Sequence, residues 1–219
     1  MGRNQTGYVT HWNPRTVSDA MKLIVVTDDD DYFLESGKQI AGDILALYGG
    51  EAAEIGDVLD IGCGIGRVAR HVAPRARKLV MADISEPMLE MAGARLRDQR
   101  NLEFFHSAPN TLRGLDDDSF DLVYSVLVLQ HVEREDAFLM LREIKRVLKP
   151  GGKAFLTFPN ILADQYLESF VTYAETGEQA TNVARARFYT PQEVARLIPA
   201  SGLTLVDLRE GPELIAICA

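Results

Sequence analysis

The sequence predicts an α/β protein whose doubly wound, mostly parallel seven-stranded sheet closes with an antiparallel hairpin at the C-terminus. The first observation behind this prediction is that apolar, strand-like runs alternate with helix-like periodic segments along most of the 219 residues. Such alternation gives parallel strands joined by right-handed crossovers. The second observation is that the last two strand-like runs, 203–208 and 214–218, are separated by only five residues. A connection that short cannot carry a parallel crossover, so these two strands should pair antiparallel.

Periodicity and turn residues define the elements in order. Strand character is expected in seven apolar runs, which are residues 58–61, 78–82, 102–105, 120–126, 154–158, 203–208 and 214–218. Residues 86–96 and the segment containing Ala137, Leu141 and Ile144 have apolar side chains at helical spacing. The breaker Pro150, followed by two glycines, should stop the second of these helices. The sequence Thr-Pro-Gln-Glu at 190–193 predicts a capping box that starts a short helix.

Charge and composition limit the function classes. The formal net charge of −9 argues against a nucleic-acid-binding protein, whose contact surface is normally basic. No apolar stretch approaches the ~18 residues of a membrane span, and the N-terminus lacks the basic-then-apolar layout of a signal peptide. Cys63 should lie too far from Cys218 for a disulfide if Cys218 is on the last strand of the sheet. These features predict a reduced, cytoplasmic protein with no nucleic-acid or membrane partner.

A glycine-rich loop follows the first predicted strand. Gly62, Gly64 and Gly66 stand at alternate positions, and glycine permits positive φ and a close approach of backbone to ligand. A strand, a glycine loop and a helix form the nucleotide-binding half of a doubly wound unit, which predicts a nucleoside-containing cofactor. A dinucleotide loop would have its third glycine at position 67, which is Arg67 here. Asp60 would also repel a pyrophosphate, whereas it would favour a cofactor with an ammonium group and a sulfonium cation.

Four ordered motifs resemble those of the class I S-adenosylmethionine-dependent methyltransferases of the small-molecule type. The motifs are VLDIGCGIG at 58–66, MADIS at 81–85, SFDLVYS at 119–125 and RVLKPGG at 146–152. The segment YTPQEV at 189–194 and the predicted closing hairpin are also similar to the family.

The resemblance implies a Rossmann-like fold with an N-terminal helical cap at 1–50, an S-adenosylmethionine-binding core at 51–219 and a lid insertion at about 160–188. The implied reaction moves a methyl group to an N or O atom of a small molecule or an exposed peptide group and leaves S-adenosylhomocysteine.

Side-chain chemistry and the resemblance together indicate the cofactor site. Asp83 follows the second strand about twenty residues after the glycines, where a carboxylate can accept both hydroxyls of a ribose. Ile84 and Met88 would flank the adenine, or equally pack in the core. The family often has an aspartate after the third strand to bind adenine, whereas this chain has Ala108, so Ser107 or a backbone carbonyl would substitute. The predicted cofactor-binding residues are Asp60, Gly62, Cys63, Gly64, Gly66, Asp83, Ile84, Met88, Ser107, Ala108, Ser125, Val126 and Gln130.

His131, after the fourth strand, is the candidate general base. A histidine of ordinary pKa, ~6.5, can take a proton from an acceptor near neutral pH, although it could also simply cap or pack the helix that starts there. Some O-methyltransferases bind a metal here through acids beside the histidine. Leu127 and Gln130 occupy those places in this chain, so no metal is expected. The candidate substrate-binding residues are Trp12, His106, Tyr166 and Tyr173, although aromatic residues of a lid could instead form its own small core.

Two alternatives from other classes remain open on the sequence. The first is a catalytically silent domain that binds S-adenosylmethionine as a scaffold or sensor, and tight binding without turnover would identify it. The second is an NAD-dependent oxidoreductase, which Arg67 and the closing hairpin disfavour.

Overall fold

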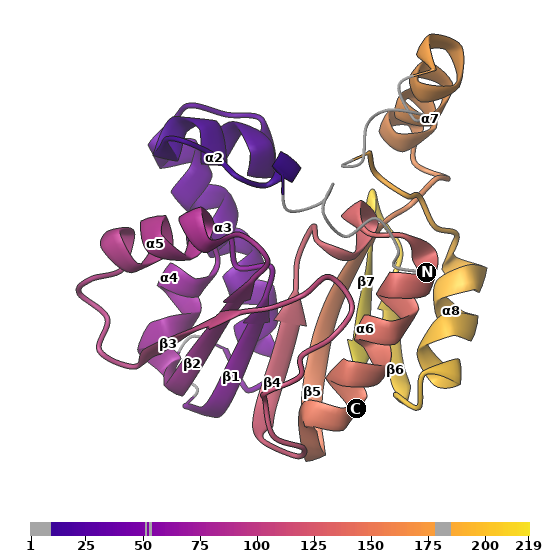
Figure 1. Cartoon of the computed structure of the whole chain (residues 1–219). Coiled ribbons are helices and arrows are strands. Elements are labelled where there is room, and N and C mark those ends of the chain that lie inside the picture. Colours follow the sequence, from indigo (N-terminus) through magenta and orange to yellow (C-terminus); the bar gives the residue numbers. More distant parts are fainter. Residues whose placement is uncertain (1–9, 51, 53, 178–184) are drawn as a thin grey trace.

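A computed structural model describes residues 10–50, 52, 54–177 and 185–219 of the chain (Figure 1). In this part a single sheet contains β1 (Ile55–Ile61), β2 (Ala76–Asp83), β3 (Leu102–His106), β4 (Phe120–Ser125), β5 (Leu148–Pro159), β6 (Leu205–Arg209) and β7 (Glu213–Cys218). The strand order is β3-β2-β1-β4-β5-β7-β6. Strands β1 to β5 run parallel to one another, and β7 runs antiparallel to both β5 and β6. The predicted α/β fold with a closing antiparallel hairpin is confirmed.

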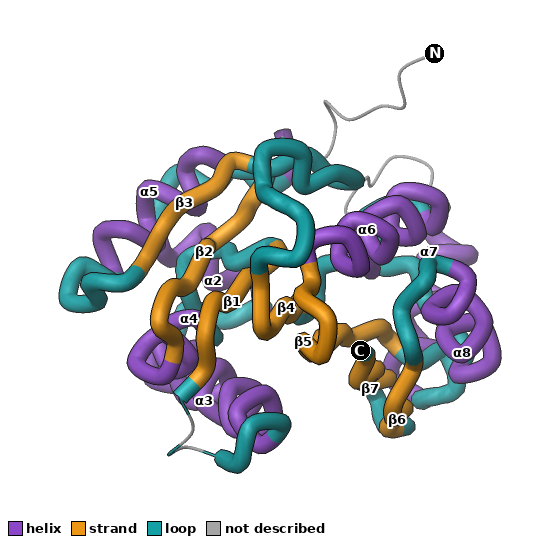
Figure 2. Tube along the Cα trace, turned by 90° about the horizontal axis from the view of Figure 1, so that it is seen from below, coloured by secondary structure: helices purple, strands orange, loops and turns teal. Residues whose placement is uncertain are grey.

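Helices cover both faces of this sheet (Figure 2). The helical elements of the described residues are α2 (Val17–Val25), α3 (Asp30–Ala46), α4 (Ala69–Val72), η1 (Ala73–Arg75), α5 (Glu86–Arg95), η2 (Leu129–His131), α6 (Arg134–Val147), α7 (Asp164–Thr176) and α8 (Pro191–Ala200). Buried side chains of α3, α4 and α5 join one hydrophobic cluster, and those of α6 and α8 join another. Val58 and Leu59, neighbours on β1, belong to different clusters because successive strand side chains point to opposite faces.

The boundary between α6 and β5 differs in detail from the prediction. The helix ends at Val147, ahead of Pro150 as expected, but β5 begins at once at Leu148 instead of at residue 154. Leu148 pairs with Phe120 of β4, and the register then shifts before Leu122. A local irregularity accommodates Pro150 in the strand, because proline has no N–H to donate to a ladder.

The predicted capping box of α8 is confirmed. The Thr190 hydroxyl accepts a hydrogen bond from the Glu193 amide at 3.2 Å, and the Glu193 carboxylate accepts one from the Thr190 amide at 2.9 Å. This short helix packs against β6 and β7 and fixes the start of the hairpin.

The two cysteines lie on opposite faces of the sheet. Cys63 belongs to the cluster under α3 and α4, and Cys218 to the cluster under α6 and α8. Both are buried and neither forms a disulfide. Within the described ranges, no helix combines the length and the apolar character needed to cross a membrane.

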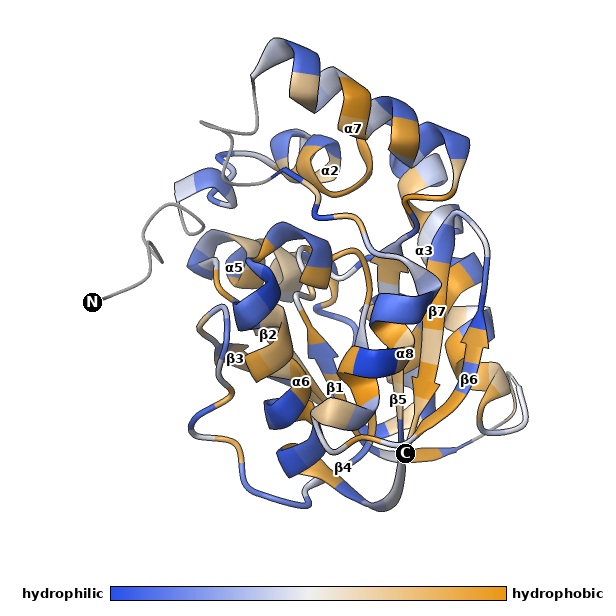
Figure 3. Cartoon of the chain, turned by 90° about the vertical axis from the view of Figure 1, so that its right-hand side faces the viewer, coloured by the Kyte–Doolittle hydropathy of each residue, from blue (hydrophilic) through white to orange (hydrophobic). Residues whose placement is uncertain are grey.

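Two helices lie beyond the same end of the sheet. Figure 1 shows α2 above β1 and β2, and α7 projecting above β5 and β7. No side chain of α7 is buried, and its Leu167, Phe170 and Val171 are 48%, 47% and 43% exposed. Apolar positions are visible along this helix in Figure 3. Helix α7 therefore packs only loosely against the body of the fold.

Candidate active site

The glycine loop between β1 and α4 closes over the end of β2. Gly62 and Gly64 have φ of +72° and +51°, values that residues with a side chain rarely adopt. The Gly62 amide donates to the Ala82 carbonyl at 2.7 Å. A Cβ atom at Gly62 would lie 2.3 Å from Cγ2 of Val128, and one at Gly64 would lie 2.7 Å from Cδ1 of Ile24. The loop is thus enclosed by segments that belong to none of the sequence motifs.

Asp83 stands at the end of β2, where the sequence predicts a ribose contact. Its buried carboxylate accepts hydrogen bonds from the amides of Gly64 at 2.8 Å and Ser85 at 3.0 Å. Burial raises the pKa of Asp83, and these backbone donors oppose the rise. Because each carboxylate oxygen has two lone pairs, Asp83 can brace the glycine loop and still accept ribose hydroxyls. The Ser85 hydroxyl accepts from the Met88 amide at 3.3 Å and caps α5.

A pocket opens beside Asp83 and the glycine loop. Ten predicted site residues line it, namely Trp12, Gly62, Gly64, Asp83, Ile84, Met88, Ser107, Ala108, Val126 and His131. The wall is mostly apolar with a few polar groups, an arrangement that suits a nucleoside.

The pocket is also lined by residues that were not predicted from the sequence. They are Ile24, Ile61, Pro109, Leu127, Val128, Val132 and Met140. Ile24 comes from α2 and Met140 from α6, so neither belongs to a motif. Leu127 has φ of +60°, and its amide donates to the Thr157 hydroxyl at 2.9 Å. Backbone strain of this kind often marks a functional site, but the sequence carries no signal for it, because leucine rarely adopts positive φ.

Five predicted cofactor residues lie behind the pocket wall, and these are Asp60, Cys63, Gly66, Ser125 and Gln130. The Ser125 hydroxyl donates to the Ile61 carbonyl at 3.3 Å, which ties β4 to β1. The Gln130 amide nitrogen lies 3.1 Å from the His131 ring. Burial raises the pKa of the Cys63 thiol, so this cysteine stays protonated and packs as an apolar group.

Asp60 lies beneath the glycine loop beside a buried tyrosine. Its side chain is 4% exposed and accepts a hydrogen bond from the Tyr124 hydroxyl at 2.9 Å. Burial raises the pKa of Asp60 to about 7; Tyr124 and the charge of Arg67 lower it, and the charge of Asp83 raises it. Asp60 is therefore a carboxylate above about pH 7 and a neutral acid below it.

Trp12 and His131 close one end of the pocket. Their ring centroids are 4.7 Å apart at an interplanar angle of 60°, so a residue from the N-terminal segment contacts one that follows β4. His106, in contrast, is exposed: one ring nitrogen lies 3.0 Å from the Ile84 carbonyl and the other 3.4 Å from Glu86. The structure brings Trp12 to the pocket and leaves His106 outside it.

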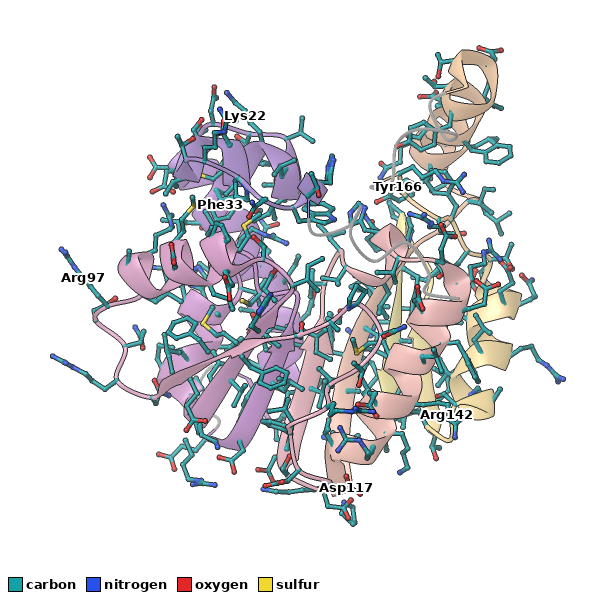
Figure 4. All side chains as sticks on the ribbon, viewed as in Figure 1. Lys22, Phe33, Arg97, Asp117, Arg142 and Tyr166 are labelled. Carbon is teal, nitrogen blue, oxygen red and sulfur yellow. The ribbon has the colours of Figure 1, made fainter. Side chains whose placement is uncertain are left out.

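The aromatic residues of α7 cluster around Phe188. The rings of Tyr166, Phe170 and Tyr173 pack around Phe188, with centroid distances of 5.6, 6.4 and 6.1 Å. The Tyr166 hydroxyl also donates to the carboxylate of Glu213 on β7, and Figure 4 shows Tyr166 at the base of α7. Tyr173 lines a separate hollow between α7 and the start of α6. A contact of Tyr166 or Tyr173 with substrate stays a prediction.

The substitution Tyr166→Phe is expected to destabilise the protein more at alkaline than at acidic pH. Burial raises the pKa of Glu213 to about 7, so in the folded protein Glu213 is a carboxylate only above about pH 7. A hydrogen bond to a charged group contributes ~1.5–3 kcal/mol and a neutral one ~0.5–1.5 kcal/mol. The loss of unfolding free energy should therefore be about 1.5–3 kcal/mol near pH 8.5 and about 1 kcal/mol near pH 5.5.

Urea unfolding at the two pH values measures this difference, with Tyr173→Phe as the matched control on the same helix. An equal loss at both pH values would contradict an ionised Glu213 as the partner of Tyr166.

The site fits S-adenosylmethionine better than a dinucleotide. Asp83 offers a carboxylate for a ribose, and Asp60 supplies negative charge below a loop that would otherwise suit a pyrophosphate. Among the described residues, no three His, Cys, Asp or Glu side chains gather to hold a metal ion.

Comparison with known proteins agrees with this geometry. Residues 59–156 match the family model described as a methyltransferase domain. The chain is 30% identical over 159 residues to the methyltransferase GfsG of Streptomyces halstedii, an alignment that covers 71% of this chain and 55% of that protein. It is 29% identical over 156 residues to the ubiquinone biosynthesis O-methyltransferase of Idiomarina loihiensis, covering 67% of this chain and 60% of that protein.

Among solved structures, the chain is similar to magnesium protoporphyrin IX methyltransferase from Synechocystis PCC 6803 with bound S-adenosylhomocysteine. The TM-score is 0.71 at 17% identity, and the superposition covers 98% of this chain and 99% of the other. This likeness establishes the fold.

The chain spans between a half and two thirds of the length of the two curated relatives. The predicted family, its Rossmann-like fold and its cofactor, S-adenosylmethionine, are confirmed. The strand order, the glycine loop with Asp83, and the matched model lead to one conclusion: residues 59–156 form a methyltransferase domain, within a chain that has the fold of the class I S-adenosylmethionine-dependent methyltransferases.

Proposed function

We propose that this chain moves the methyl group of S-adenosylmethionine to an N or O atom of a small molecule or an exposed peptide group. The observation that carries the proposal is one pocket in which Asp83, the glycine loop and His131 share a wall. This arrangement would bring a methyl donor bound at Asp83 close to the one imidazole on the pocket wall. S-adenosylhomocysteine would leave as the product.

When bound, S-adenosylmethionine would supply a sulfonium-activated methyl group that a nucleophile can attack in line, and the breaking of the C–S bond would release S-adenosylhomocysteine. The residues of this chain would bind the cofactor and the acceptor and orient them for the transfer. Asp83 would hold the ribose hydroxyls, and the backbone of Gly62 and Gly64 would approach the ligand closely. The apolar wall would exclude water, and alignment of two reactants can lower a barrier by ~7–11 kcal/mol. His131 would take a proton at a ring nitrogen when the acceptor must lose one.

The acceptor that suits this pocket is small and largely apolar. Around His131 the wall consists of Trp12, Val128 and Val132, all apolar or aromatic. The curated relative from Idiomarina loihiensis is named for O-methylation in ubiquinone biosynthesis, and the Synechocystis enzyme for a magnesium protoporphyrin. These names support a small-molecule acceptor.

The domain roles are part of the same proposal. Residues 1–50 would act as a cap, because Trp12 and Ile24 line the pocket. Residues 160–188 would act as a lid over the acceptor, and within that segment 178–184 lie outside the described residues. A cytoplasmic location is proposed for the chain.

A product-release screen tests the proposal directly. The chain would be incubated with S-adenosylmethionine and a panel of amines, phenols, carboxylates and peptides, and S-adenosylhomocysteine would be measured. Turnover with any acceptor supports the proposal. Tight binding of S-adenosylmethionine without turnover across the panel would favour the silent scaffold or sensor instead. Calorimetric binding of NAD in place of S-adenosylmethionine would contradict both.

A further inference from the structure

The helix η2, which carries His131 to the pocket wall, is only three residues long. Its turn is closed by the His131 amide, which donates to the Val128 carbonyl at 2.9 Å. The last carbonyls of any helix have no partner inside that helix, and α6 does not take these up, because its own ladder begins with the Ala137 amide donating to the Glu133 carbonyl. The carbonyls of Gln130 and His131 therefore need donors from another part of the chain.

Arg187 supplies a donor to each of these two carbonyls. Its backbone amide donates to the Gln130 carbonyl at 2.8 Å, and its Nη1 atom donates to the His131 carbonyl at 3.2 Å. Arg187 lies in the segment between α7 and α8, inside the predicted lid insertion. A residue more than fifty positions further along the chain thus caps the end of η2.

The guanidinium of Arg187 is itself held in place. Its side chain is 8% exposed, and its Nη2 atom donates to the Glu133 carboxylate at 2.5 Å. Burying a guanidinium is costly unless an anion and hydrogen-bond acceptors compensate. The planar fork of arginine can serve a carboxylate and a carbonyl at the same time. Arg187 therefore occupies a fixed position between η2 and the start of α6.

The two capped residues are the ones that place the imidazole at the pocket. The His131 ring contacts Trp12, with the centroids 4.7 Å apart, and one of its ring nitrogens lies 3.1 Å from the Gln130 amide nitrogen. The backbone position of a residue determines where its side chain begins. If the carbonyls of Gln130 and His131 lost the side chain that holds them, the ring would lose its fixed place beside Trp12.

We propose that Arg187 is a positioning residue of the methyl-transfer site, which caps η2 and thereby holds the His131 ring on the pocket wall against Trp12. Arg187 is not among the residues that line this pocket, so it acts through His131. The inference rests on the proposed function, because it gives the position of His131 a part in the transfer. It also gives the segment after α7 a second role, as a support of the pocket from behind.

Two arginine variants separate this role from a general loosening of the same segment. Arg187→Met removes the guanidinium and keeps the backbone amide, and it leaves a Glu133 side chain that is 48% exposed and open to water. Arg134→Met is the matched control. The Arg134 guanidinium donates to the Phe188 carbonyl at 2.6 Å and pairs with Glu193, so it holds the same segment without contacting η2 through these bonds.

The position of the ring is read directly by NMR in the ligand-free protein. Trp12 is the only tryptophan of the chain, so its indole signal is unambiguous, and His131→Gln identifies the imidazole signal. A nuclear Overhauser cross-peak between the two rings is expected in wild type and in Arg134→Met, and it should be lost in Arg187→Met. A cross-peak of wild-type strength in Arg187→Met would overturn the proposal.

Arg187→Lys decides the matter if Arg187→Met does not fold. A lysine keeps a cation beside Glu133, but its compact ammonium lacks the fork that reaches a carboxylate and a carbonyl together. The cross-peak between Trp12 and His131 should therefore be weaker in Arg187→Lys than in wild type. An undiminished cross-peak in this variant would contradict the role of Arg187.

Kinetics show whether this position matters for the transfer. With an acceptor that turns over in the product-release screen, Arg187→Met should lower kcat by about 10- to 100-fold, since a misplacement of 1 Å can cost ~100-fold. The Kd of S-adenosylmethionine should not change, because the contacts of Asp83 with the glycine loop are retained. In a His131→Gln background, Arg187→Met should cause no further loss of kcat, because residues that act as one unit are not additive.

An undiminished kcat in Arg187→Met, a full further loss in the His131→Gln background, or an equal loss in Arg134→Met would each overturn the proposal. Absence of turnover by wild type with every acceptor would instead contradict the proposed function. The cross-peak between Trp12 and His131 needs neither cofactor nor acceptor, so it tests the hold of Arg187 on His131 in that case too.

Discussion

Replacing Asp83 with alanine is expected to weaken S-adenosylmethionine binding by about 1.5–3 kcal/mol, the scale of hydrogen bonds to a charged group. That corresponds to roughly a 10- to 150-fold rise in Kd. The carboxylate is expected to accept the ribose hydroxyls, and it also receives the amides of Gly64 and Ser85. The lost ribose contact and the lost contacts with the two amides both act on the same pocket, so the rise in Kd should be large.

Calorimetry measures the change in Kd, and thermal unfolding of the ligand-free protein separates binding from stability. Asp83→Asn keeps one acceptor oxygen and should fall between wild type and alanine. Glu86→Ala removes an exposed carboxylate three positions further along and should leave Kd unchanged, since Glu86 faces His106 outside the pocket. Unchanged affinity in Asp83→Ala would refute the ribose assignment.

The substitution Gly37→Ala is expected to lower the free energy of unfolding by about 1–3 kcal/mol, the usual range for overpacking a tight contact. The added methyl would lie 2.2 Å from the Arg67 carbonyl oxygen and 2.8 Å from Arg67 Cγ. A backbone oxygen cannot rotate away as a side chain can, so α3 as a whole must shift. Alanine has the better helix propensity by about 1 kcal/mol, which offsets only part of the cost.

Gly42→Ala is the matched control, because Gly42 lies on the same helix and a Cβ atom there meets nothing within 4 Å. It should stabilise the protein by up to about 1 kcal/mol through helix propensity alone. Urea unfolding of the two variants compares them directly. Equal changes in the free energy of unfolding for Gly37→Ala and Gly42→Ala would mean that the contact between α3 and Arg67 does not constrain the fold.

The fold could be predicted because each helix and strand is indicated by a sequence pattern within a few neighbouring residues. The strand-like runs, the breaker at Pro150 and the capping box at Thr190 each report on a few neighbouring residues, and their order determines the topology. The place of Asp83 on the pocket wall was predictable for the same reason, since this residue ends the strand that follows the glycine loop. The start of β5 was missed because a bulged strand can include a proline that sequence rules read as a stop.

The rest of the site depends on contacts between distant segments, which periodicity does not encode. Ile24 meets Gly64 and Trp12 meets His131 only because the N-terminal helices fold back over the sheet. The environment of Asp60 likewise depends on Tyr124, from a strand more than sixty residues away. The aromatic side chains of α7 pack on Phe188. Amino-acid composition alone cannot distinguish this packing from aromatic side chains that face a ligand.

The close approaches of Ile24 to Gly64 and of Gly37 to Arg67 tie α2 and α3 directly to the glycine loop. Any ligand that orders this loop must also slow the local opening of α2 and α3, because the coupling free energy between two events is reciprocal. Slower amide hydrogen exchange in these helices would then report occupancy of a pocket that they only border. A destabilised N-terminal region would, by the same reciprocity, release the methyl donor more easily.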